Sequence, residues 1–322
     1  YKIEVEITNK CNKQCIICEH TYWQEPPNDI SFEQFQYIVS QFPHLRWVNM
    51  TGEGSGFLNK DFLKMIEYAR SRDISVNFVD EFDFLDEINS RKLVELGVNC
   101  IWISMDGAIK ETYEKIKIGC NFERAIRNVK NLLQVKKELK SPLPTICFRF
   151  TVTTLNFHEM FKMVELVHSF GDLGEGSYLE FVGLLKFSEN EKYYLPEVPQ
   201  EILELTKRQA AKLGVPVAFT HIDKIRLRDV SQCASWAEPY IMMGGYVLPC
   251  CGVLMSNRRD FLRQHCFGNI FEKSFKEIWY SERYKKFRQM VPSKISPVPL
   301  LCVGCRGFDA SKREKYGICK DI

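Results

Sequence analysis

The sequence has no excess of one charge, no long uncharged apolar run, no internal repeat and no low-complexity segment. Its 44 Lys and Arg residues against 41 Asp and Glu residues leave a net charge of +3, which is too balanced for a protein that binds nucleic acid by neutralising phosphates. A membrane-spanning helix needs about 20 consecutive apolar residues. We therefore expect a globular protein with neither a nucleic-acid nor a membrane partner.

Cysteine, by contrast, is abundant, at 13 of 322 residues. An odd number, in a chain whose 45% hydrophobic content already allows a large core, argues against the disulfide framework of a secreted protein. Three of the cysteines lie within eight residues near the start, and two form a CxxC pair near the end. This clustering indicates metal ligation, and with it a reducing, cytoplasmic location.

Apolar and amphipathic segments alternate over about the first 185 residues. The strands predicted from this pattern are residues 2–8, 47–50, 75–79, 100–104, 146–153 and 178–184. The predicted helices are residues 31–41, 60–71, 90–96, 121–139 and 156–168. Such alternation indicates an α/β fold with a parallel sheet, open or closed into a barrel, whose ligands bind at the carboxyl ends of the strands. After residue 185 prolines accumulate, and we expect the βα repeat to stop.

The first cysteine group, Cys11, Cys15 and Cys18, follows the first predicted strand directly. Three soft thiolates on one short loop suit an iron–sulfur cluster, and three ligands would leave one iron of a four-iron cluster free for an outside ligand. A structural zinc site, or three incidental cysteines, are the alternatives.

The CxxxCxxC spacing is the signature of radical S-adenosylmethionine (radical SAM) enzymes, and the chain resembles this family over about residues 2–185. The segment TGEG after the second predicted strand resembles the family's GGEP segment, which holds the amino group of S-adenosylmethionine (SAM). ISMDG resembles the SLDG segment, and TVTTLN resembles the end of the fifth strand. The resemblance implies a partial (β/α)6 TIM barrel, with a radical SAM core at residues 1–224. The cofactor-binding residues that it implies are Thr51, Gly52, Glu53, Gly54, Ser104, Asp106 and Thr151.

The resemblance also implies the chemistry. SAM chelates the free iron of a [4Fe-4S] cluster, and one electron from the cluster cleaves a carbon–sulfur bond to give a 5′-deoxyadenosyl radical that abstracts hydrogen from the substrate. A flavodoxin- or ferredoxin-type reductant would supply the electron. Arg149 lies within the fifth predicted strand, where a buried positive charge needs a negatively charged partner. The partner would be either the SAM carboxylate or a carboxylate of the protein.

A second cysteine group resembles the start of the SPASM extension of radical SAM enzymes, or its shorter one-cluster twitch form. Its members are Cys233, Cys250, Cys302 and Cys305. The resemblance implies a domain at residues 225–322 with one auxiliary [4Fe-4S] cluster, for which Cys319 is the substitute ligand. A cluster with four protein ligands would accept the electron of the substrate radical, which favours a dehydrogenase or other oxidoreductase. Structural zinc, or a cluster without redox function, are the alternatives.

Substrate binding is predicted at the acidic turn after the third predicted strand, where Asp80, Glu81 and Asp83 could hold a cationic group such as an amino sugar or a lysine-bearing peptide. Glu180, near the sixth strand, could act with them. The alternative for the turn is a solvated surface.

The predicted function is therefore a radical SAM oxidoreductase acting on a small polar molecule, such as an amino sugar or cyclitol, or on a peptide. Because the first strand begins at residue 2, without room for a leader-binding module before it, a small substrate is slightly favoured. One alternative is a peptide maturase or radical epimerase with Cys251 as hydrogen donor. Another, of a different class, is a non-catalytic iron–sulfur redox sensor.

Overall fold

A computed structural model describes residues 1–220, 222, 233, 237–256, 258–293, 295–303, 305 and 316–321. Nine strands of this part form one sheet, in the order β11-β10-β1-β3-β4-β5-β7-β8-β9. All neighbouring strands run parallel except β10 and β11. The bounds are β1 Lys2–Val5, β3 Trp47–Met50, β4 Ser75–Asp80, β5 Cys100–Ser104, β7 Thr145–Val152, β8 Tyr178–Gly183, β9 Val217–Thr220, β10 Tyr240–Met242 and β11 Tyr246–Leu248.

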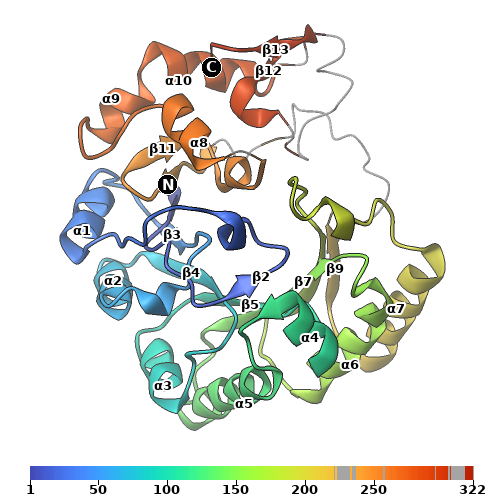
Figure 1. The fold of residues 1–322 in the computed structure, drawn as a ribbon. Coiled ribbons are helices and arrows are strands. Elements are labelled where there is room, and N and C mark those ends of the chain that lie inside the picture. Colours follow the sequence, from blue (N-terminus) through green and yellow to red (C-terminus); the bar gives the residue numbers. More distant parts are fainter. Residues whose placement is uncertain are drawn as a thin grey trace.

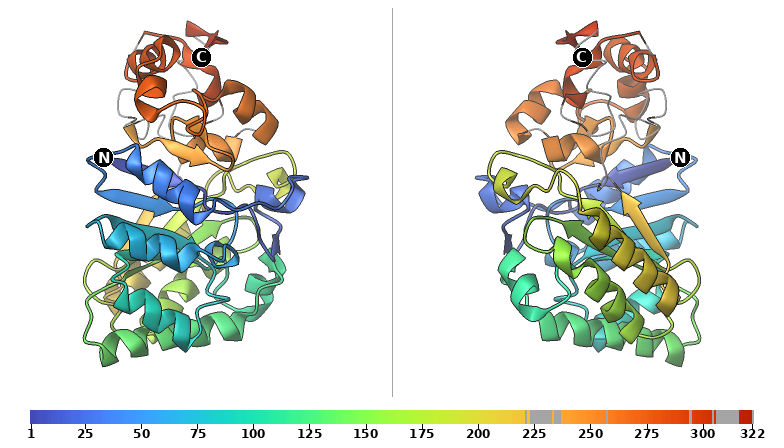
Figure 2. Two further views of the ribbon diagram at one scale, coloured as in Figure 1. Left: turned by 90° about the vertical axis from the view of Figure 1, so that its left-hand side faces the viewer. Right: turned by 90° about the vertical axis from the view of Figure 1, so that its right-hand side faces the viewer.

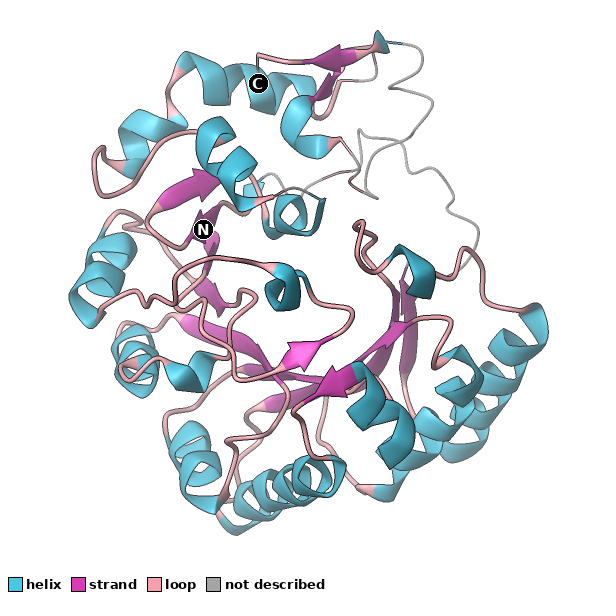
Figure 3. Ribbon diagram, in the orientation of Figure 1, coloured by secondary structure: helices cyan, strands magenta, loops and turns pink. Residues whose placement is uncertain are grey.

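The helices of the first 220 residues lie outside the curved sheet (Figures 1 and 3). Their bounds are α1 Phe32–Ser40, α2 Phe62–Arg70, α3 Glu87–Glu95, α4 Lys110–Ile116, α5 Phe122–Glu138, α6 Met160–Ser169 and α7 Gln200–Leu213. Successive strand residues point to opposite faces, so each strand buries its apolar side under the helices. In β5, Ile101 and Ile103 are fully buried, whereas Trp102 and Ser104 are partly exposed on the other, concave face. This is the partial barrel that the sequence predicts.

Strand register aligns the residues of the concave face, which we call the barrel interior, in layers. The lowest layer pairs Glu4 with Asn49 and Asn49 with Asn77. The next layer runs from Val79 through Trp102 and Cys147 to Tyr178, and the one above it from Ser104 through Arg149 to Glu180. The interior is therefore polar and carries charge, as expected of a surface that holds ligands rather than core.

The prediction that the βα repeat stops after residue 185 is wrong, because α7 and β9 continue it. The prolines that suggested a break lie at element ends, where proline is tolerated. Pro199 is the N-cap residue of α7, and Pro216 comes directly before β9. Strand β9 extends the sheet by one parallel strand beyond β8.

Smaller shifts occur at other element ends. Ser31 forms the predicted capping box with Gln34 at the start of α1. Helix α3 begins at Glu87 instead of residue 90, because Asp86 accepts a hydrogen bond from the N–H of Asn89 and so caps an earlier turn. The segment 156–168 is divided into a short 3-10 helix, Phe157–Glu159, followed by α6.

The carboxyl-terminal part is joined to the barrel through the sheet itself. Strand β10 pairs in parallel with β1, with Glu4 opposite Tyr240, so the sheet crosses the predicted domain boundary. The boundary at residues 224 and 225 lies outside the described residues. Figure 2 shows the segments from β10 onward at the top of the view, beside the β1 edge of the sheet. They include α8 Arg259–His265, α9 Phe275–Trp279, α10 Glu282–Met290 and the small β12–β13 sheet, Val298–Pro299 with Ile318–Cys319.

Candidate active site

A loop that follows β1 carries the three amino-terminal cysteines and is held against the segment after α4. Its residues Gln14–Cys15, strand β2, pair antiparallel with Lys117–Ile118, strand β6, so that Cys15 lies opposite Lys117. These two short strands were not predicted. They fix the cysteine loop at the carboxyl end of the barrel, where a βα fold places its functional residues.

One cavity of about 290 Å³ at this end gathers most of the predicted site. The predicted residues that line it are Cys11, Cys15, Cys18, Gly52, Glu53, Gly54, Asp80, Glu81, Ser104, Asp106, Arg149 and Thr151. Four other predicted residues, Thr51, Asp83, Glu180 and Cys251, are not part of its lining.

The donor set around the cavity fits an iron–sulfur cluster. Burial raises the pKa of the Cys11 and Cys18 thiols, and the charge of Glu53 raises that of Cys18 further. Across the described part of the chain, no three His, Cys, Asp or Glu side chains are grouped to hold a single metal ion. A four-iron cluster fits three thiols around a cavity better than one ion does, because it takes soft thiolates and distributes them over several irons.

The TGEG segment after β3 packs directly on the cysteine loop. A Cβ at Gly54 would lie 2.5 Å from the carbonyl oxygen of Thr8, so only glycine allows this approach. The N–H of Ser55 donates to the carbonyl of Lys10 at 2.8 Å. The segment is thereby held beside the cysteines, and Glu53 is directed into the cavity.

Glu53 fits the amino group of SAM. Its side chain is buried, and its Oε1 atom makes no hydrogen bond within the described residues. Burial raises the pKa of Glu53 well above its usual range, and the nearby Glu19 and Glu6 carboxylates add to the shift. A buried carboxylate oxygen without a donor is unfavourable, and a ligand ammonium would satisfy it.

Lys117 is a site residue that sequence reasoning missed. Its Nζ is buried, lies 3.2 Å from an Asp106 oxygen and donates to Ser104 Oγ at 2.9 Å. Asp106 also accepts from the N–H of Thr151 at 2.7 Å. Burial alone would lower the pKa of Lys117, but Asp106 and Cys15 raise it above its usual range. Lys117 therefore places a fixed positive charge beside Cys15, and no motif in its segment indicated this.

A second missed group connects the cavity to the carboxyl-terminal part. Glu6, directly after β1, is fully buried and forms an ion pair with Arg259 at the start of α8. Arg259 also lies 3.5 Å from Glu53 and 3.9 Å above the ring of Trp23. Glu4 and Glu6, which alternate with apolar residues in the predicted strand 2–8, were the available signal, since buried charges require partners.

The second cysteine group is brought together in part. Cys233 and Cys305 are both close enough to Cys250 to raise the pKa of its thiol by charge repulsion. The N–H of Cys305 donates to the carbonyl of Cys302 at 3.1 Å. Burial, followed by the charge of Cys305, raises the pKa of Cys250 to about 12. Cys319 lies on β13. Cys233, Cys250 and Cys305, from segments about 70 residues apart in sequence, thus approach one another, and Cys302 is joined to Cys305 through the backbone.

The predicted substrate carboxylates fall into two groups. Asp83 is engaged by Lys13 and Arg124, and Glu180 is paired with Arg149 at 2.9 Å. Asp80 and Glu81, in contrast, each keep one buried oxygen without a hydrogen bond to any described residue. Burial and the neighbouring Glu81 raise the pKa of Asp80 well above its usual range. Asp83 and Glu180 are therefore paired with cations of the protein. Asp80 and Glu81 line the cavity, and each has an oxygen that could accept a hydrogen bond from a ligand.

Cys251 does not line the cavity and lies beside Glu4, in the lowest layer of the barrel interior. Burial raises the pKa of its thiol well above the usual range, and the neighbouring Glu4 carboxyl raises it further. Glu4 accepts from Asn49 at 3.2 Å, and its Oε2 makes no hydrogen bond with a described residue. The charge of Arg149 also reaches Cys251. The thiol of Cys251 is thus directed into the barrel interior, not toward solvent.

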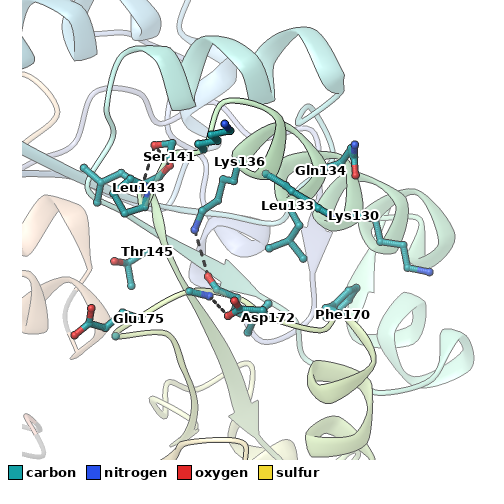
Figure 4. A pocket seen from close by; sticks show the side chains of 16 residues that line it. Lys130, Leu133, Gln134, Lys136, Ser141, Leu143, Thr145, Phe170, Asp172 and Glu175 are labelled. Carbon is teal, nitrogen blue, oxygen red and sulfur yellow. Dashed lines mark hydrogen bonds between the residues drawn. The ribbon is translucent and has the colours of Figure 1, made fainter.

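A separate cavity of about 930 Å³ lies at the opposite, amino ends of β7 and β8 (Figure 4). Lys136 is its buried charge, and its Nζ donates to the carbonyls of Pro144 at 2.6 Å and Leu173 at 3.2 Å. The lysine thus connects the loops that precede β7 and β8. None of the predicted site residues lines this cavity, and in a βα fold this end contributes stability and not catalysis.

Comparison with known proteins agrees with the geometry. A model of the SPASM iron–sulfur cluster-binding domain matches residues 233–306. A tungsten-containing aldehyde ferredoxin oxidoreductase cofactor-modifying protein of Pyrococcus furiosus is 25% identical over 95% of this chain and 87% of its own. The crystal structure of Streptococcus suis SuiB bound to SAM covers 99% of this chain and 74% of SuiB, with a TM-score of 0.69 and 14% identity. The structure of native anSMEcpe with bound AdoMet covers 97% of this chain and 88% of anSMEcpe, with a TM-score of 0.63 and 16% identity.

These matches support a radical SAM enzyme with a SPASM domain at residues 233–306. They also support SAM and two [4Fe-4S] clusters as the cofactors. SuiB has also been crystallised with its precursor peptide SuiA. No helix of the described residues is long and apolar enough to cross a membrane.

Proposed function

We propose that this radical SAM enzyme oxidises a substrate that carries a cationic group, with the auxiliary cluster accepting the substrate's electron. The substrate is either a small polar molecule, such as an amino sugar or cyclitol, or a peptide. The observation that carries the proposal is that Asp80 and Glu81, which line the cavity, each have a buried carboxylate oxygen that makes no hydrogen bond with a described residue.

When bound, the reduced cluster and SAM supply the abstraction of a hydrogen atom. Cys11, Cys15 and Cys18 would hold that cluster. Glu53 would accept the SAM ammonium on its free Oε1, and the Lys117 charge would face the SAM carboxylate. Glu53 and Lys117 would thus hold the ammonium and the carboxylate of the amino-acid part of SAM.

Carboxylates of the cavity would bind the substrate. Asp80 ends β4, Glu81 follows it, and both line the cavity, so they would hold the cationic group of the substrate there. In a buried setting, a cation is bound strongly only where its charge is matched. Neutral analogues of the substrate should therefore bind far more weakly.

The second cysteine group supports oxidation. Cys233, Cys250, Cys302 and Cys305 would give the auxiliary cluster four protein ligands, which leaves no free iron for substrate and fits electron transfer. The relatives support a modifying enzyme, since one of them modifies a cofactor and SuiB binds a precursor peptide.

A panel of substrates tests the proposal. Anaerobic, reconstituted protein is given dithionite, SAM and either amine-bearing compounds (aminocyclitols, lysine-containing peptides) or their neutral N-acetyl analogues. We expect an amine-bearing compound to raise 5′-deoxyadenosine formation at least about ten-fold above the substrate-free rate, and its acetylated analogue not to do so. Equal stimulation by the neutral analogue would contradict the cationic substrate.

A second candidate function is radical epimerisation with Cys251 as hydrogen donor. The observation that favours it is the placement of the Cys251 thiol in the barrel interior beside Glu4. Epimerisation in D₂O would place solvent deuterium on the substrate carbon, whereas oxidation would not.

A further inference from the structure

We infer that Arg259, contributed by the SPASM domain, is a positioning residue for SAM binding, because it holds Glu53 through a buried network that the barrel cannot form alone. This inference rests on the proposed function, in which Glu53 receives the SAM ammonium.

The network joins three segments that are far apart in sequence. Arg259 opens α8, Glu6 follows β1, and Glu53 follows β3. Arg259 Nη1 donates to Glu6 Oε2 at 2.7 Å, its Nη2 contacts Glu6 Oε1, and the same Nη2 lies 3.5 Å from Glu53 Oε2. At most 4% of each of these side chains is exposed, so water does not weaken the pairing.

Glu6 is the fixed end of the network. Besides the two contacts from Arg259, its Oε2 accepts from the N–H of Met243 at 2.8 Å, directly after β10. Glu6 also packs on Gly52, where an added Cβ would lie 2.6 Å from Glu6 Cγ. Trp23 covers the other side of the guanidinium, 3.9 Å from its ring centre. Arg259 is therefore held in a single orientation.

Glu53 is held less tightly than Glu6. Its one cationic neighbour in the described residues is Arg259, at a distance too long for a strong hydrogen bond, and its Oε1 makes none. Glu19 and Glu6 both add negative charge around it. One guanidinium does not compensate all of these carboxyl groups, so an incoming ammonium would stabilise the ionised form of Glu53.

Loss of Arg259 would change this balance in two ways. Glu6 and Glu53 would become neighbouring buried carboxylates with no cation between them, and their repulsion would move Glu53. The guanidinium also fixes two carboxylates at once through its planar fork, which a lysine ammonium does not reproduce. The SAM site would keep Glu53 but lose its orientation, so SAM affinity would fall while the cysteine ligands remain.

The test compares Arg259→Gln and Arg259→Lys with Arg263→Gln. Arg263 lies on the same helix and pairs with Glu25 at 2.8 Å, but its side chain is 35% exposed and contacts no carboxylate of the network, so it is a matched control. The protein is reconstituted anaerobically. Iron content, melting temperature, SAM affinity by equilibrium dialysis and the EPR spectrum of the reduced protein with and without SAM are measured for each variant.

We expect Arg259→Gln to bind SAM about ten-fold or more weakly, with wild-type iron content, and to lose the SAM-induced change of the EPR spectrum at a concentration that saturates wild type. Arg259→Lys should recover part of the affinity, and Arg263→Gln should match wild type. Should Arg259→Gln not fold, a several-fold weaker affinity of Arg259→Lys at an unchanged melting temperature supports the inference, and a wild-type affinity overturns it.

Two results would overturn the inference. One is SAM binding by Arg259→Gln within two-fold of wild type, and the other is a loss of affinity that Arg263→Gln shares. Failure of the wild type itself to bind SAM is a distinct result, because it would overturn the proposed function together with this inference.

Discussion

Glu4 shows, at the scale of single residues, how a buried carboxyl group makes stability depend on pH. Burial is the main reason that its pKa is raised. The folded state therefore holds a proton on Glu4 at pH values where the unfolded state has released it, and stability falls as pH rises through that window. The same group offers an unpartnered oxygen to the barrel interior.

We therefore predict that Glu4→Gln flattens the pH dependence of stability. Above the ordinary pKa of glutamate, where the wild type loses stability with rising pH, the variant should be the more stable of the two, because Gln carries no charge to bury. Melting temperatures of both proteins, recorded anaerobically from pH 5 to pH 9, measure this. Parallel curves for the two proteins would contradict it.

Cys251 separates the two candidate functions. If oxidation is the reaction, Cys251→Ala should keep substrate-dependent 5′-deoxyadenosine formation within about two-fold of wild type, and product made in D₂O should carry no solvent deuterium at the reacting carbon. Cys266→Ala, a change of a cysteine outside both predicted ligand groups, is the control. Deuterium in the wild-type product that disappears in Cys251→Ala would instead establish Cys251 as the hydrogen donor.

Single residues also mark where sequence reasoning fails. The cysteines, Glu53 and Asp106 belong to local motifs with characteristic spacing, so they could be predicted. Lys117 and Arg259 could not, since each acquires its role by approaching residues far away in the chain. For Arg149, sequence reasoning left two partners open, and the structure pairs it with Glu180.

At the scale of elements, the close packing of the TGEG segment on the cysteine loop is the feature on which the cavity depends. The Gly54 position leaves no room for a methyl group, since both the Thr8 and Lys10 carbonyls lie within 3 Å of an added Cβ. A side chain there must separate the two segments.

We predict that Gly54→Ala displaces Glu53 and lowers SAM affinity at least about ten-fold. Gly214→Ala is the control: Gly214 ends α7 with a φ of 68°, and an added Cβ there meets nothing within 4 Å. The control should cost about 1 kcal/mol of folding stability, because alanine is strained at positive φ, and leave SAM binding intact. Wild-type SAM affinity in Gly54→Ala would show that the packing is not required.

Element prediction succeeded where periodicity was strong and failed where proline and short pairings mattered. The strands 47–50 and 100–104 were predicted to the residue. Helix α7 and β9 were missed because the prolines around them were taken for a break, although Pro199 and Pro216 only mark their ends. The β2–β6 pair, two residues in each strand, has no periodic signal at all.

At the scale of the whole molecule, the barrel and the SPASM domain share one sheet and one buried ion-pair network. Strand β10 covers the edge of β1, and Arg259 neutralises Glu6. Phe42 and Phe275 add an apolar contact across the same junction, with ring centroids 4.3 Å apart. The two parts are thus not independent domains joined only by a linker.

We accordingly predict that residues 1–224 alone do not form a stable protein. Removal of the rest would expose the edge of β1 and would take from Glu6 both of its partners, Arg259 and the N–H of Met243. Expression of this segment and its circular dichroism melting curve provide the measurement. A cooperative transition near that of the full chain would contradict the shared sheet as a requirement for folding.

Iron content and product formation, measured on the same samples, show whether the chain is a SAM-cleaving enzyme with two clusters. Wild type and the triple variant Cys11→Ala, Cys15→Ala, Cys18→Ala are reconstituted anaerobically, iron and sulfide are counted, and 5′-deoxyadenosine is assayed after dithionite and SAM are added. We predict about eight irons per chain in the wild type and about four in the variant, with product from the wild type alone. A fully loaded wild type that does not cleave SAM would contradict the enzyme and favour an iron–sulfur redox sensor.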